Sequence, residues 1–314
     1  MAAATAWDAG ADRSVRVAVV TGANTGIGWE TARALAARAA TVVLACRNRS
    51  AAERAARDIT ASVPGSQVHV VTLDLADSAS IAACAQQLRA RWPVIDLLIN
   101  NAGVMAHAPG RTVDGFETDF GTNFLGPFAL TAQLVESVAA APAGRVVTVS
   151  SITHRIRAAT LDLADPHFRT QPFDTTTAYA RSKLAAVTFM LELQRRLAAA
   201  GSSTISVGAH PGGVRTNILS HQNRAIRWVY HPRMARLTGW FTQSPADGAR
   251  PILRAALDPA LRGGEFFGPG GRWDLVGAPV PVRTARRAQD PEVGARLWAR
   301  AQEWTGVEFR IPAG

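Results

Sequence analysis

The residues whose types and spacing most directly suggest chemistry are Tyr179 and Lys183. They lie four residues apart in TAYARSKLAAVTFMLELQRRL, a stretch whose apolar spacing predicts an amphipathic helix. Residues four apart share one face of a helix, so a phenol and an ammonium group would meet at one place. A Tyr–Lys pair at this spacing is also common in simple packing, so the surrounding motifs must decide whether this pair is catalytic or only packs.

Three glycines follow a β-branched run in VVTGANTGIGWETARAL, which begins at Val19. Gly22, Gly26 and Gly28 give the spacing G-x-x-x-G-x-G, which differs from the usual dinucleotide fingerprint G-x-G-x-x-G. Gly22 would permit a tight turn after the strand, Gly26 a close approach of the backbone to a pyrophosphate, and Gly28 packing of the helix on the sheet. A plain glycine-rich turn between strand and helix is the alternative.

The residue after the second predicted strand indicates which dinucleotide would bind. In a dinucleotide fold this strand ends near the adenosine ribose, where an acidic residue would bond the 2′-hydroxyl. The strand ends in VVLACRNRS, with Arg47 directly after it and no acid there. A guanidinium suits a 2′-phosphate, so the sequence favours NADP(H) over NAD(H), with an ordinary surface arginine as the alternative. Asp74, in TLDLAD after the third strand, could meet the adenine ring.

Amides and hydroxyls end two further predicted strands. Asn100 and Asn101 close an apolar strand in DLLINNAG. Buried amides need hydrogen-bond partners, so this pair either ties neighbouring strands together or lines a cofactor cleft. The strand RVVTVSS ends in Ser150 and Ser151, and strand alternation alone does not decide which hydroxyl faces a site.

The apolar runs of the chain predict the elements that position these motifs. Continuous β-branched runs alternate with Ala/Leu/Arg-rich stretches of helical spacing, which indicates a parallel sheet covered on both faces. Right-handed crossovers make such a sheet doubly wound. The predicted strands are Val15–Val20, Thr41–Cys46, Val68–Val71, Ile95–Asn100, Arg145–Ser150, Thr204–His210 and a short last strand at Glu265–Phe267. The predicted helices include Gly26–Arg38, Ser78–Arg91 and Ala178–Ala199.

We therefore predict a single-domain α/β Rossmann fold, with a doubly wound, mostly parallel sheet of about seven strands and helices on both faces. No linker-like change of composition and no internal repeat divides the chain. Residues 1–14 are expected to be a flexible tail and residues 15–314 the dinucleotide-binding domain, with a C-terminal extension at about 268–314. The stretch Asn217–Phe241 breaks the alternation of strands and helices.

Composition limits the classes of function. The net charge of +10 comes mostly from arginine spread over the whole chain, without a basic block interleaved with aromatic residues. We therefore expect no specific nucleic-acid partner, although the basic charge keeps that class open. Cys46 and Cys84 lack metal-ligand spacing, which indicates a reducing compartment and no metal site. Without a secretory signal or an apolar run of about 18 residues, the expected localisation is cytoplasmic.

Taken in order, the motifs TGANTGIG, NNAG, Asn123 in TNFLGPF, the serine pair, Tyr179-x-x-x-Lys183 and HPGGVRT resemble the short-chain dehydrogenase/reductase family. The resemblance extends over nearly the whole chain, and together the motifs are highly specific. DGFETDFGTNFLGPF and AYARSKLAAVTFMLELQRRL are most similar to the retinol-dehydrogenase-like branch and its bacterial relatives. That branch carries an insertion matching the 27 residues between Ser151 and Tyr179, which would add a wall to the substrate pocket.

The resemblance implies hydride transfer between a nicotinamide and a carbonyl carbon. Tyr179 would be the general acid/base, with its pKa lowered by Lys183. Ser151, the second serine of the pair, would donate a hydrogen bond to the substrate oxygen. Asn123 would hold a water molecule that links Lys183 to solvent. Two histidines could border the site as loop residues rather than as catalysts, namely His107 and His154.

The resemblance also implies a set of cofactor-binding residues that begins in the glycine motif and ends in PGGVRT. Val214 and Thr216 would contact the nicotinamide carboxamide. The full set is Gly22, Asn24, Thr25, Gly26, Ile27, Gly28, Arg47, Asp74, Leu75, Asn101, Ala102, Gly103, Tyr179, Lys183, Pro211, Gly212, Val214 and Thr216.

The expected activity is NADP(H)-dependent oxidoreduction of a small lipophilic alcohol or carbonyl compound. An NADP(H)-binding sensor or scaffold with weak catalysis is the alternative, against which stand the intact Asn123, Ser151, Tyr179 and Lys183. Members of this family often pair through helices corresponding to Asp114–Ala139 and Ala178–Ala199, so a homo-oligomer is expected.

Residues 217–241 stand where this family places a substrate lid. The stretch NILSHQNRAIRWVYHPRMARLTGWF interleaves arginines with apolar side chains, Trp228 and Met234 among them. It would form an adaptable apolar wall for a lipophilic substrate larger than a simple sugar. The same pattern would also suit a weak peripheral contact with an anionic membrane, or a core helix with a solvated basic face. We favour the substrate wall.

Overall fold

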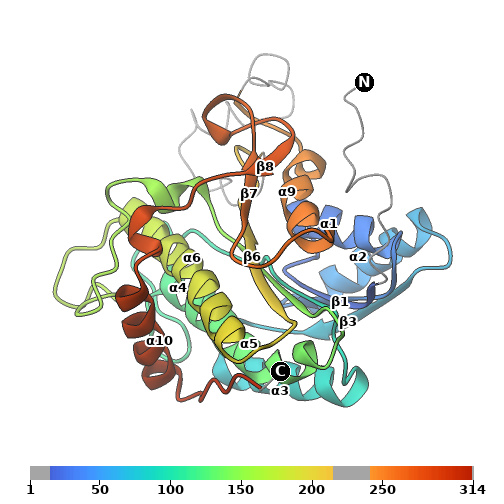
Figure 1. Cartoon of the computed structure of the whole chain (residues 1–314), viewed down its shortest axis with the longest axis horizontal. Coiled ribbons are helices and arrows are strands. Elements are labelled where there is room, and N and C mark those ends of the chain that lie inside the picture. The colour runs from blue at the N-terminus through green and yellow to red at the C-terminus, as the bar shows by residue number, and fades with distance from the viewer. Residues whose placement is uncertain (1–14, 215–240, 313–314) are drawn as a thin grey trace.

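The computed structural model describes residues 15–214 and 241–312, and these form one α/β unit around a single sheet (Figure 1). Within these ranges the sheet has eight strands, hydrogen-bonded in the order β3-β2-β1-β4-β5-β6-β7-β8. Neighbouring strands are parallel except for β7 and β8. The strands are β1 (Val15–Thr21), β2 (Ala39–Cys46), β3 (Gln67–Thr72), β4 (Leu97–Asn100), β5 (Arg145–Val149), β6 (Ile205–Ala209), β7 (Phe266–Pro269) and β8 (Pro279–Pro281).

The central strands are rich in Val, Ile, Leu and Ala because both of their faces are covered. Every residue of β4 and of β5 is buried. In a parallel sheet all strands end at the same edge, and ligands bind outside that edge where the strand order reverses. The residues that follow β1, β4, β5 and β6 therefore come together at one edge of this sheet, and the predicted motifs lie in those segments.

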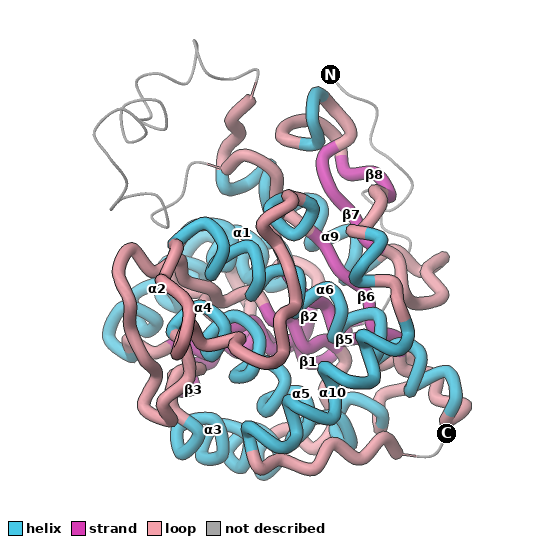
Figure 2. The backbone as a smooth tube through the Cα atoms, turned by 90° about the vertical axis from the view of Figure 1, so that its left-hand side faces the viewer, coloured by secondary structure: helices cyan, strands magenta, loops and turns pink. Residues whose placement is uncertain are grey.

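Helices cover both faces of the sheet (Figures 1 and 2). One apolar core packs α1, α2 and α9 on the sheet and includes Leu35, Ile59 and Ile252. The other core packs α3, α5 and α6 and includes Phe124 and Phe128. The helices are α1 (Gly26–Ala36), α2 (Arg49–Ser62), α3 (Ser78–Arg91), α4 (Thr118–Phe120), α5 (Gly126–Ala139), α6 (Thr175–Ala199), α9 (Pro245–Leu257) and α10 (Pro291–Thr305), with short turns η1 (Gly121–Leu125), η2 (Ile152–Arg155), η5 (Arg272–Asp274) and η6 (Arg286–Ala288).

The sheet has one strand more than the sequence predicted. β8 pairs antiparallel with β7, with Val280 opposite Gly268. Its sequence, Pro-Val-Pro, does not suggest a strand because proline has no N–H to donate to a neighbour. At the edge of a sheet one side of a strand needs no such donor, so proline is tolerated there. β8 lies within the predicted C-terminal extension.

The helix expected over Asp114–Ala139 is shorter and is interrupted. It begins only at Thr118, because the Glu117 carboxylate accepts hydrogen bonds from the first backbone amides of α4. The wider π-helical turn η1 then separates α4 from α5, with Asn123 at its centre. Such π-turns occur frequently at functional sites.

The C-terminal helix α10 lies along α6 and packs with side chains of α5 in the same apolar core (Figure 1). The ring of Trp298 in α10 packs edge-on against Phe128 of α5, with centroids 5.2 Å apart, and lies 5.9 Å from Phe189 of α6. The ring centroid of Phe309, which follows α10, lies 4.4 Å from that of Trp298. The chain's own C-terminal segment therefore covers part of α5 at Phe128 and part of α6 at Phe189. The expected homo-oligomer stays a prediction.

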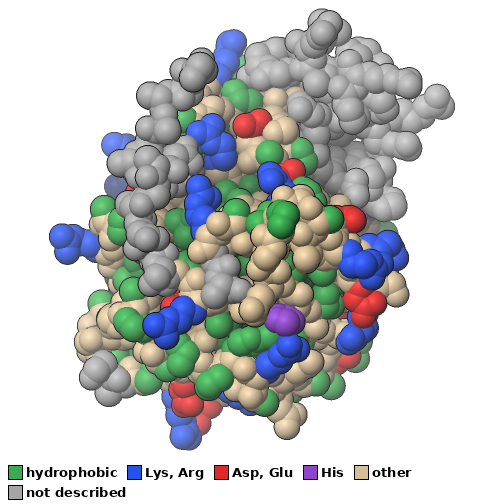
Figure 3. Space-filling model, turned by 90° about the vertical axis from the view of Figure 1, so that its right-hand side faces the viewer, with side chains coloured by type: hydrophobic (Ala, Val, Ile, Leu, Met, Phe, Trp, Pro, Cys, Tyr) green, Lys and Arg blue, Asp and Glu red, His purple; other side chains and the backbone are tan. Residues whose placement is uncertain are grey.

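One face of the described part carries its charge in a dispersed form. On the face shown in Figure 3, arginine side chains lie apart from one another among apolar and uncharged ones. None of the helices in residues 15–214 and 241–312 combines the length and apolarity that a membrane crossing requires.

Candidate active site

α6 presents Tyr179 and Lys183 beside the end of β5. The helix begins after Asp174, whose carboxylate accepts a hydrogen bond from the amide of Thr177. Lys183 is only 4% exposed, and its Nζ donates to the carbonyl oxygen of Val149 over 3.4 Å. The same Nζ lies 5.7 Å from the centre of the Tyr179 ring. The two side chains thus meet at the end of β5, as the spacing predicted.

The two serines after β5 take different positions. Ser150 is buried, and its Oγ donates to the carbonyl oxygen of Lys183 at 2.8 Å, which fastens α6 to the sheet. Ser151 is half-buried, and its hydroxyl lies close enough to Tyr179 to lower the pKa of the phenol. Of the two hydroxyls that strand alternation left undecided, Ser151 is the one that lies beside Tyr179.

Burial dominates the electrostatics of Tyr179 and Lys183. It raises the pKa of Tyr179 to about 12, against a smaller lowering by the neighbouring hydroxyl of Ser151. It lowers the pKa of Lys183 to about 8, against the attraction of Asp119, which raises that pKa. The resemblance implied that Lys183 lowers the pKa of Tyr179. Among the protein's own groups burial outweighs any such effect, so the phenol is protonated at neutral pH.

Asn123 binds the segment that follows β4. Its Oδ1 accepts a hydrogen bond from the amide of Val104 at 2.8 Å. Its Nδ2 donates to the carbonyl oxygen of Val104 and to Oγ of Ser182, each at 2.9 Å. A Cβ on Gly103 would lie 3.0 Å from Nζ of Lys183 and 3.2 Å from Oδ1 of Asn123. Three of the predicted residues, Gly103, Asn123 and Lys183, are therefore in close contact.

Asn101 fastens the glycine turn after β1 to the end of β4. Its Nδ2 donates to the carbonyl oxygen of Thr21 at 2.8 Å, while Oγ1 of Thr21 accepts from the amides of Asn101 and Ala102. Gly22 has a φ of +66°, and a Cβ there would lie 2.9 Å from Cα of Ala102. Asn100 instead bonds Oγ1 of Thr131. Asn101 therefore ties β1 to β4, which is one of the two roles that the sequence left open for the amide pair.

The start of α1 has the features of an anion-binding turn. Gly26 has a φ of +59°, and no described atom lies within 4 Å of the position that its Cβ would occupy. Gly28 packs directly against the carbonyl group of Gly22. Thr25 makes no side-chain capping bond, whereas Asn, Asp or Ser caps α2, α3, α6, α9 and α10. The first amides of α1 thus have no side-chain acceptor, and with Asn24 and Ile27 in the same turn they fit a pyrophosphate.

The predicted adenosine end lies after β2 and β3. Arg47 directly follows β2 and is exposed. Oδ1 of Asp74 accepts a hydrogen bond from the amide of Ala76 at 3.0 Å, which closes the turn after β3. Leu75 is buried and packs against Gly126.

The loop after β6 is held from two sides. The amide of Gly213 donates to the carbonyl oxygen of Leu275 at 2.8 Å. Nε2 of Gln243 donates to the carbonyl oxygen of Pro211 at 2.7 Å. Gly212 has a φ of +72°, and Val214 is buried and paired with Gln243. Thr216 lies outside the described residues. So does the predicted lid, except for Phe241.

The two histidines named from the sequence lie in different surroundings. His107 is exposed. His154 is fully buried in η2, and its Nδ1 bonds the carbonyl oxygen of Ser151. Burial lowers the pKa of His154 to about 4, so its ring is neutral at physiological pH. His154 therefore borders the site as an interior residue that holds the backbone of Ser151.

Sequence reasoning missed one ionisable residue at this site. Asp119 in α4 is fully buried, and its charge acts on both Lys183 and Tyr179. Its position four residues before Asn123 was the available signal, because that spacing places both side chains on one helix face. Lys183, on which Asp119 acts, is the only lysine among the 34 lysine and arginine residues of the chain.

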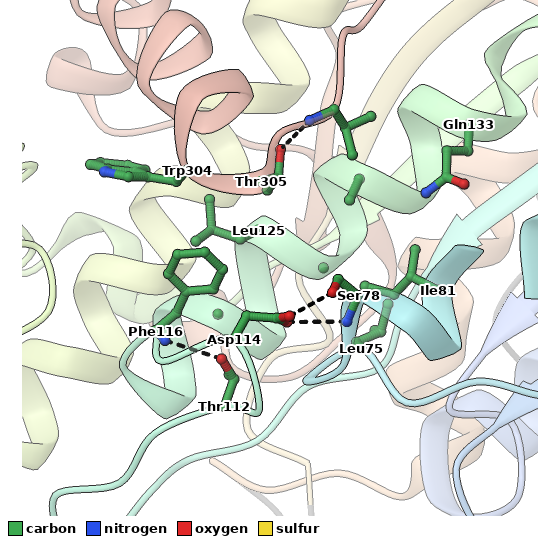
Figure 4. Close-up of a pocket in the computed structure, with 14 residues that line it drawn as sticks. Leu75, Ser78, Ile81, Thr112, Asp114, Phe116, Leu125, Gln133, Trp304 and Thr305 are labelled. Atoms are coloured by element: carbon green, nitrogen blue, oxygen red, sulfur yellow. Dashed lines mark hydrogen bonds between the residues drawn. The ribbon is translucent and has the colours of Figure 1, made fainter. Parts of the chain in front are cut away.

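A cavity of about 80 Å³ lies apart from these residues, between α3, α5 and the end of α10 (Figure 4). Trp304 and Phe116 border it, and Oγ of Ser78 donates to Oδ1 of Asp114 at its rim over 2.5 Å. Its lining includes none of the four predicted catalytic residues, Asn123, Ser151, Tyr179 and Lys183. The cavity is therefore separate from the catalytic residues, although Leu75 of the predicted cofactor-binding set lines it.

Comparison with known proteins identifies the family. Residues 16–161 match the sequence profile of the family described as short chain dehydrogenase. The chain is 40% identical over 298 residues to polyprenol dehydrogenase of Mus musculus, an alignment that covers 93% of this chain and 84% of the relative. It is 38% identical over 299 residues to retinol dehydrogenase 12 of Homo sapiens, covering 94% and 87% of the two chains.

A solved structure shows the same likeness in three dimensions. An uncharacterized protein from Mycobacterium paratuberculosis superimposes with a TM-score of 0.76 and 40% sequence identity, over 95% of this chain and 96% of that chain. Identity at this level over nearly whole chains establishes common ancestry as well as a common fold. The chain therefore belongs to the short-chain dehydrogenase/reductase family, in its retinol-dehydrogenase-like branch.

Proposed function

We propose that the protein is an NADP(H)-dependent oxidoreductase that transfers a hydride between the nicotinamide and a lipophilic alcohol or carbonyl compound. The observation that carries this proposal is that Ser151 lies beside Tyr179, with buried Lys183 one helical turn further along α6 and its Nζ 5.7 Å from the Tyr179 ring. The family uses a nicotinamide cofactor and acts on alcohols and carbonyls. The activities named for two relatives, polyprenol and retinol dehydrogenase, support an alcohol with a long apolar chain.

Tyr179 and Ser151 would handle the substrate oxygen. With a pKa of about 12 the phenol carries its proton at neutral pH, so Tyr179 is ready to donate it to a carbonyl oxygen. The hydroxyl of Ser151 would donate a second hydrogen bond and stabilise the negative charge that develops on that oxygen. When bound, the nicotinamide supplies or accepts the hydride, and its oxidised form adds a positive charge that favours the phenolate.

Lys183 and Asn123 would support this step. The pKa of Lys183, about 8, is close enough to neutrality for the ammonium to gain and lose a proton during turnover. Asn123 holds Val104 through two hydrogen bonds and so fixes the backbone beside Lys183. Its further role in holding a water molecule that connects Lys183 to solvent stays a prediction.

The cofactor would lie along the carboxyl edge of the sheet. The open amides at the start of α1 and the clear space beside Gly26 would take the pyrophosphate. Arg47 would bind the 2′-phosphate of NADP(H), because a guanidinium matches a phosphate and no acidic residue stands beside it after β2. The backbone of Val214, at the end of the loop after β6, would meet the nicotinamide carboxamide.

A lipophilic substrate would lie between the predicted lid at residues 217–241 and the insertion before Tyr179. One carboxylate orders that insertion: Asp165 accepts hydrogen bonds from the amides of Arg169, Thr170 and Gln171. A wall fixed in this way would favour one class of substrate shape over others. Apolar lid side chains would favour long hydrocarbon chains.

The proposal is tested by following NADPH oxidation with unbranched aldehydes from butanal to decanal. We expect kcat/KM to rise with chain length, and to be higher with NADPH than with NADH. Tyr179→Phe serves as the control, because it keeps the ring and removes the proton donor. Tight NADPH binding without turnover of any aldehyde would refute the oxidoreductase assignment and favour a sensor or scaffold.

The lid is tested separately with Trp228→Ala and Met234→Ala. Each change should raise KM for decanal more than for butanal while leaving the Kd for NADPH unchanged. Unaltered kinetics for both variants, together with no binding to anionic liposomes, would contradict the lid and favour a core helix.

A further inference from the structure

Asp119 is a buried carboxylate next to the candidate active site. It has no exposed surface. Its Oδ1 accepts a hydrogen bond from the amide of Ala106 at 2.8 Å, whereas its Oδ2 is buried without a hydrogen-bond partner in the described part of the chain. A buried carboxyl oxygen left unpaired is unfavourable unless a proton or a nearby positive charge compensates it.

Asp119 and Asn123 act on the same strip of backbone. The two side chains lie four residues apart, and together they make three hydrogen bonds to the segment after β4. Asn123 bonds the amide and the carbonyl oxygen of Val104, and Asp119 bonds the amide of Ala106. The same segment contains Gly103, on which a Cβ would lie 3.0 Å from Nζ of Lys183. Asp119 therefore helps to fix the backbone that runs past Lys183.

Charged groups on two elements face Asp119. Glu117, at the start of α4, repels it and so raises its pKa, while Lys183 on α6 attracts it and lowers its pKa. Asp119 in turn raises the pKa of both Lys183 and Tyr179. Glu117 has neighbours of its own. Its amide donates to Nδ1 of His167, and Arg111 and Arg181 lower its pKa by attraction. Lys183 is thus the cation that compensates Asp119.

We propose that Asp119 is a positioning residue for the reaction, whose carboxyl group holds the backbone beside Lys183 and sets the charge of Lys183, and through it that of Tyr179. This inference rests on the proposed function for its meaning in catalysis. Burial raises the pKa of Asp119 to about 7. Below that pH the carboxyl is neutral and Lys183 lacks a counter-charge. Above it, the carboxylate keeps the proton on Lys183 to higher pH.

The sequence offers a direct measurement. Lys183 is the only lysine of the chain, so protein labelled with ¹³C at lysine Cε gives one lysine resonance. Its titration reports the charge of Lys183 in the folded protein without any turnover. In the wild type we expect a midpoint near the pKa of about 8, with a smaller inflection where Asp119 ionises, at about 7.

Asp119→Asn removes the charge but leaves an amide oxygen to accept the hydrogen bond from Ala106. We expect the lysine midpoint to fall by about one pH unit, and the inflection near pH 7 to disappear. The matched control is Asp96→Asn. Asp96 is a buried carboxylate that accepts hydrogen bonds from the amides of Arg16 and Val17 at the opposite edge of the sheet, so its loss should leave the lysine titration unchanged.

Unchanged midpoints in Asp119→Asn would overturn the proposal, as would an equal shift in the Asp96→Asn control. If Asp119→Asn does not fold, the wild type alone decides, because a single-step titration without the inflection contradicts coupling to Asp119. In Asp119→Asn the alkaline pKa in the pH profile of kcat/KM for aldehyde reduction should fall by the same number of pH units as the lysine midpoint. A shifted lysine titration with an unshifted activity profile overturns the positioning role, whereas a shifted titration in a protein without turnover refutes only the proposed function.

Discussion

The hydroxyl of Ser151, which follows β5, lies close enough to the phenol of Tyr179 on α6 to lower the pKa of that phenol. Groups that bind one substrate oxygen act as a unit, so the effects of removing them should not add. We expect Tyr179→Phe to lower kcat by roughly 10²-fold or more with the fold intact, and Ser151→Ala to lower it similarly. The double variant should lose little more than the worse single variant.

Circular dichroism of each variant checks the fold, and NADPH oxidation measures kcat. Losses that multiply in the double variant would show that the two side chains act independently. Near-wild-type turnover of Tyr179→Phe would contradict the mechanism itself.

Gly22 and Gly26 form a matched pair for separating stability from cofactor binding. Both have φ near +60°, but a Cβ on Gly22 would press on the backbone of Ala102, whereas a Cβ on Gly26 would meet no described atom within 4 Å. We expect Gly26→Ala to cost about 1 kcal/mol of unfolding free energy, and Gly22→Ala clearly more. NADPH affinity should nevertheless fall more steeply in Gly26→Ala, because its methyl group would enter the space assigned to the pyrophosphate.

Urea unfolding without cofactor and fluorescence titration with NADPH measure the two effects. If Gly26→Ala binds NADPH as tightly as the wild type, the pyrophosphate does not lie beside Gly26.

Arg47 should distinguish the two dinucleotides. If its guanidinium binds the 2′-phosphate, Arg47→Ala weakens NADPH binding by about 1–3 kcal/mol and leaves NADH binding nearly unchanged. Arg49→Ala is a suitable control, because Arg49 is already paired with Glu53 in α2 at 2.8 Å. Equal losses for NADPH and NADH in Arg47→Ala would reject the assignment.

His154 should make stability depend on acid pH. Burial lowers its pKa from 6.5 to about 4 in the folded protein, so between these values the unfolded chain binds more protons. The stabilisation is therefore complete above pH 6.5 and is lost as the pH falls toward 4. We expect a loss of about 2 kcal/mol in unfolding free energy between about pH 7 and 5 from this residue.

His154→Asn keeps a donor for the carbonyl oxygen of Ser151 and does not titrate. Urea unfolding at the two pH values should show a flatter dependence for this variant than for the wild type. An unchanged slope in His154→Asn would mean that His154 is not held neutral by burial.

Much of the site could be predicted from the sequence because its spacing is local. Tyr179 and Lys183 are one helical turn apart, and Ser151 directly follows a strand, so helix and strand geometry place each of them at the carboxyl edge. The glycine turn was equally visible, because a β-branched strand precedes it and a helical pattern follows. The confirmed parallel sheet rests on the same alternation.

The remaining features depend on partners that are distant in sequence. An acidic residue in a helix ordinarily faces solvent, and only the packing of α4 on α6 buries Asp119 against Lys183. β8 contains two prolines and is a strand only because it lies at the edge of the sheet. α10 has an amphipathic pattern that would suit many surfaces, and no local rule connects Trp298 with Phe128.

The packing of α10 on α5 and α6 has a consequence for how the enzyme responds to dilution. A helix supplied by the same chain is present at a fixed effective concentration, whereas a second subunit leaves when the protein is diluted. The aromatic surface around Phe128 and Phe189 therefore stays covered at any enzyme concentration. Specific activity should accordingly be the same in a nanomolar assay as in a concentrated stock, without the lag or loss that follows dissociation of a subunit interface at this surface.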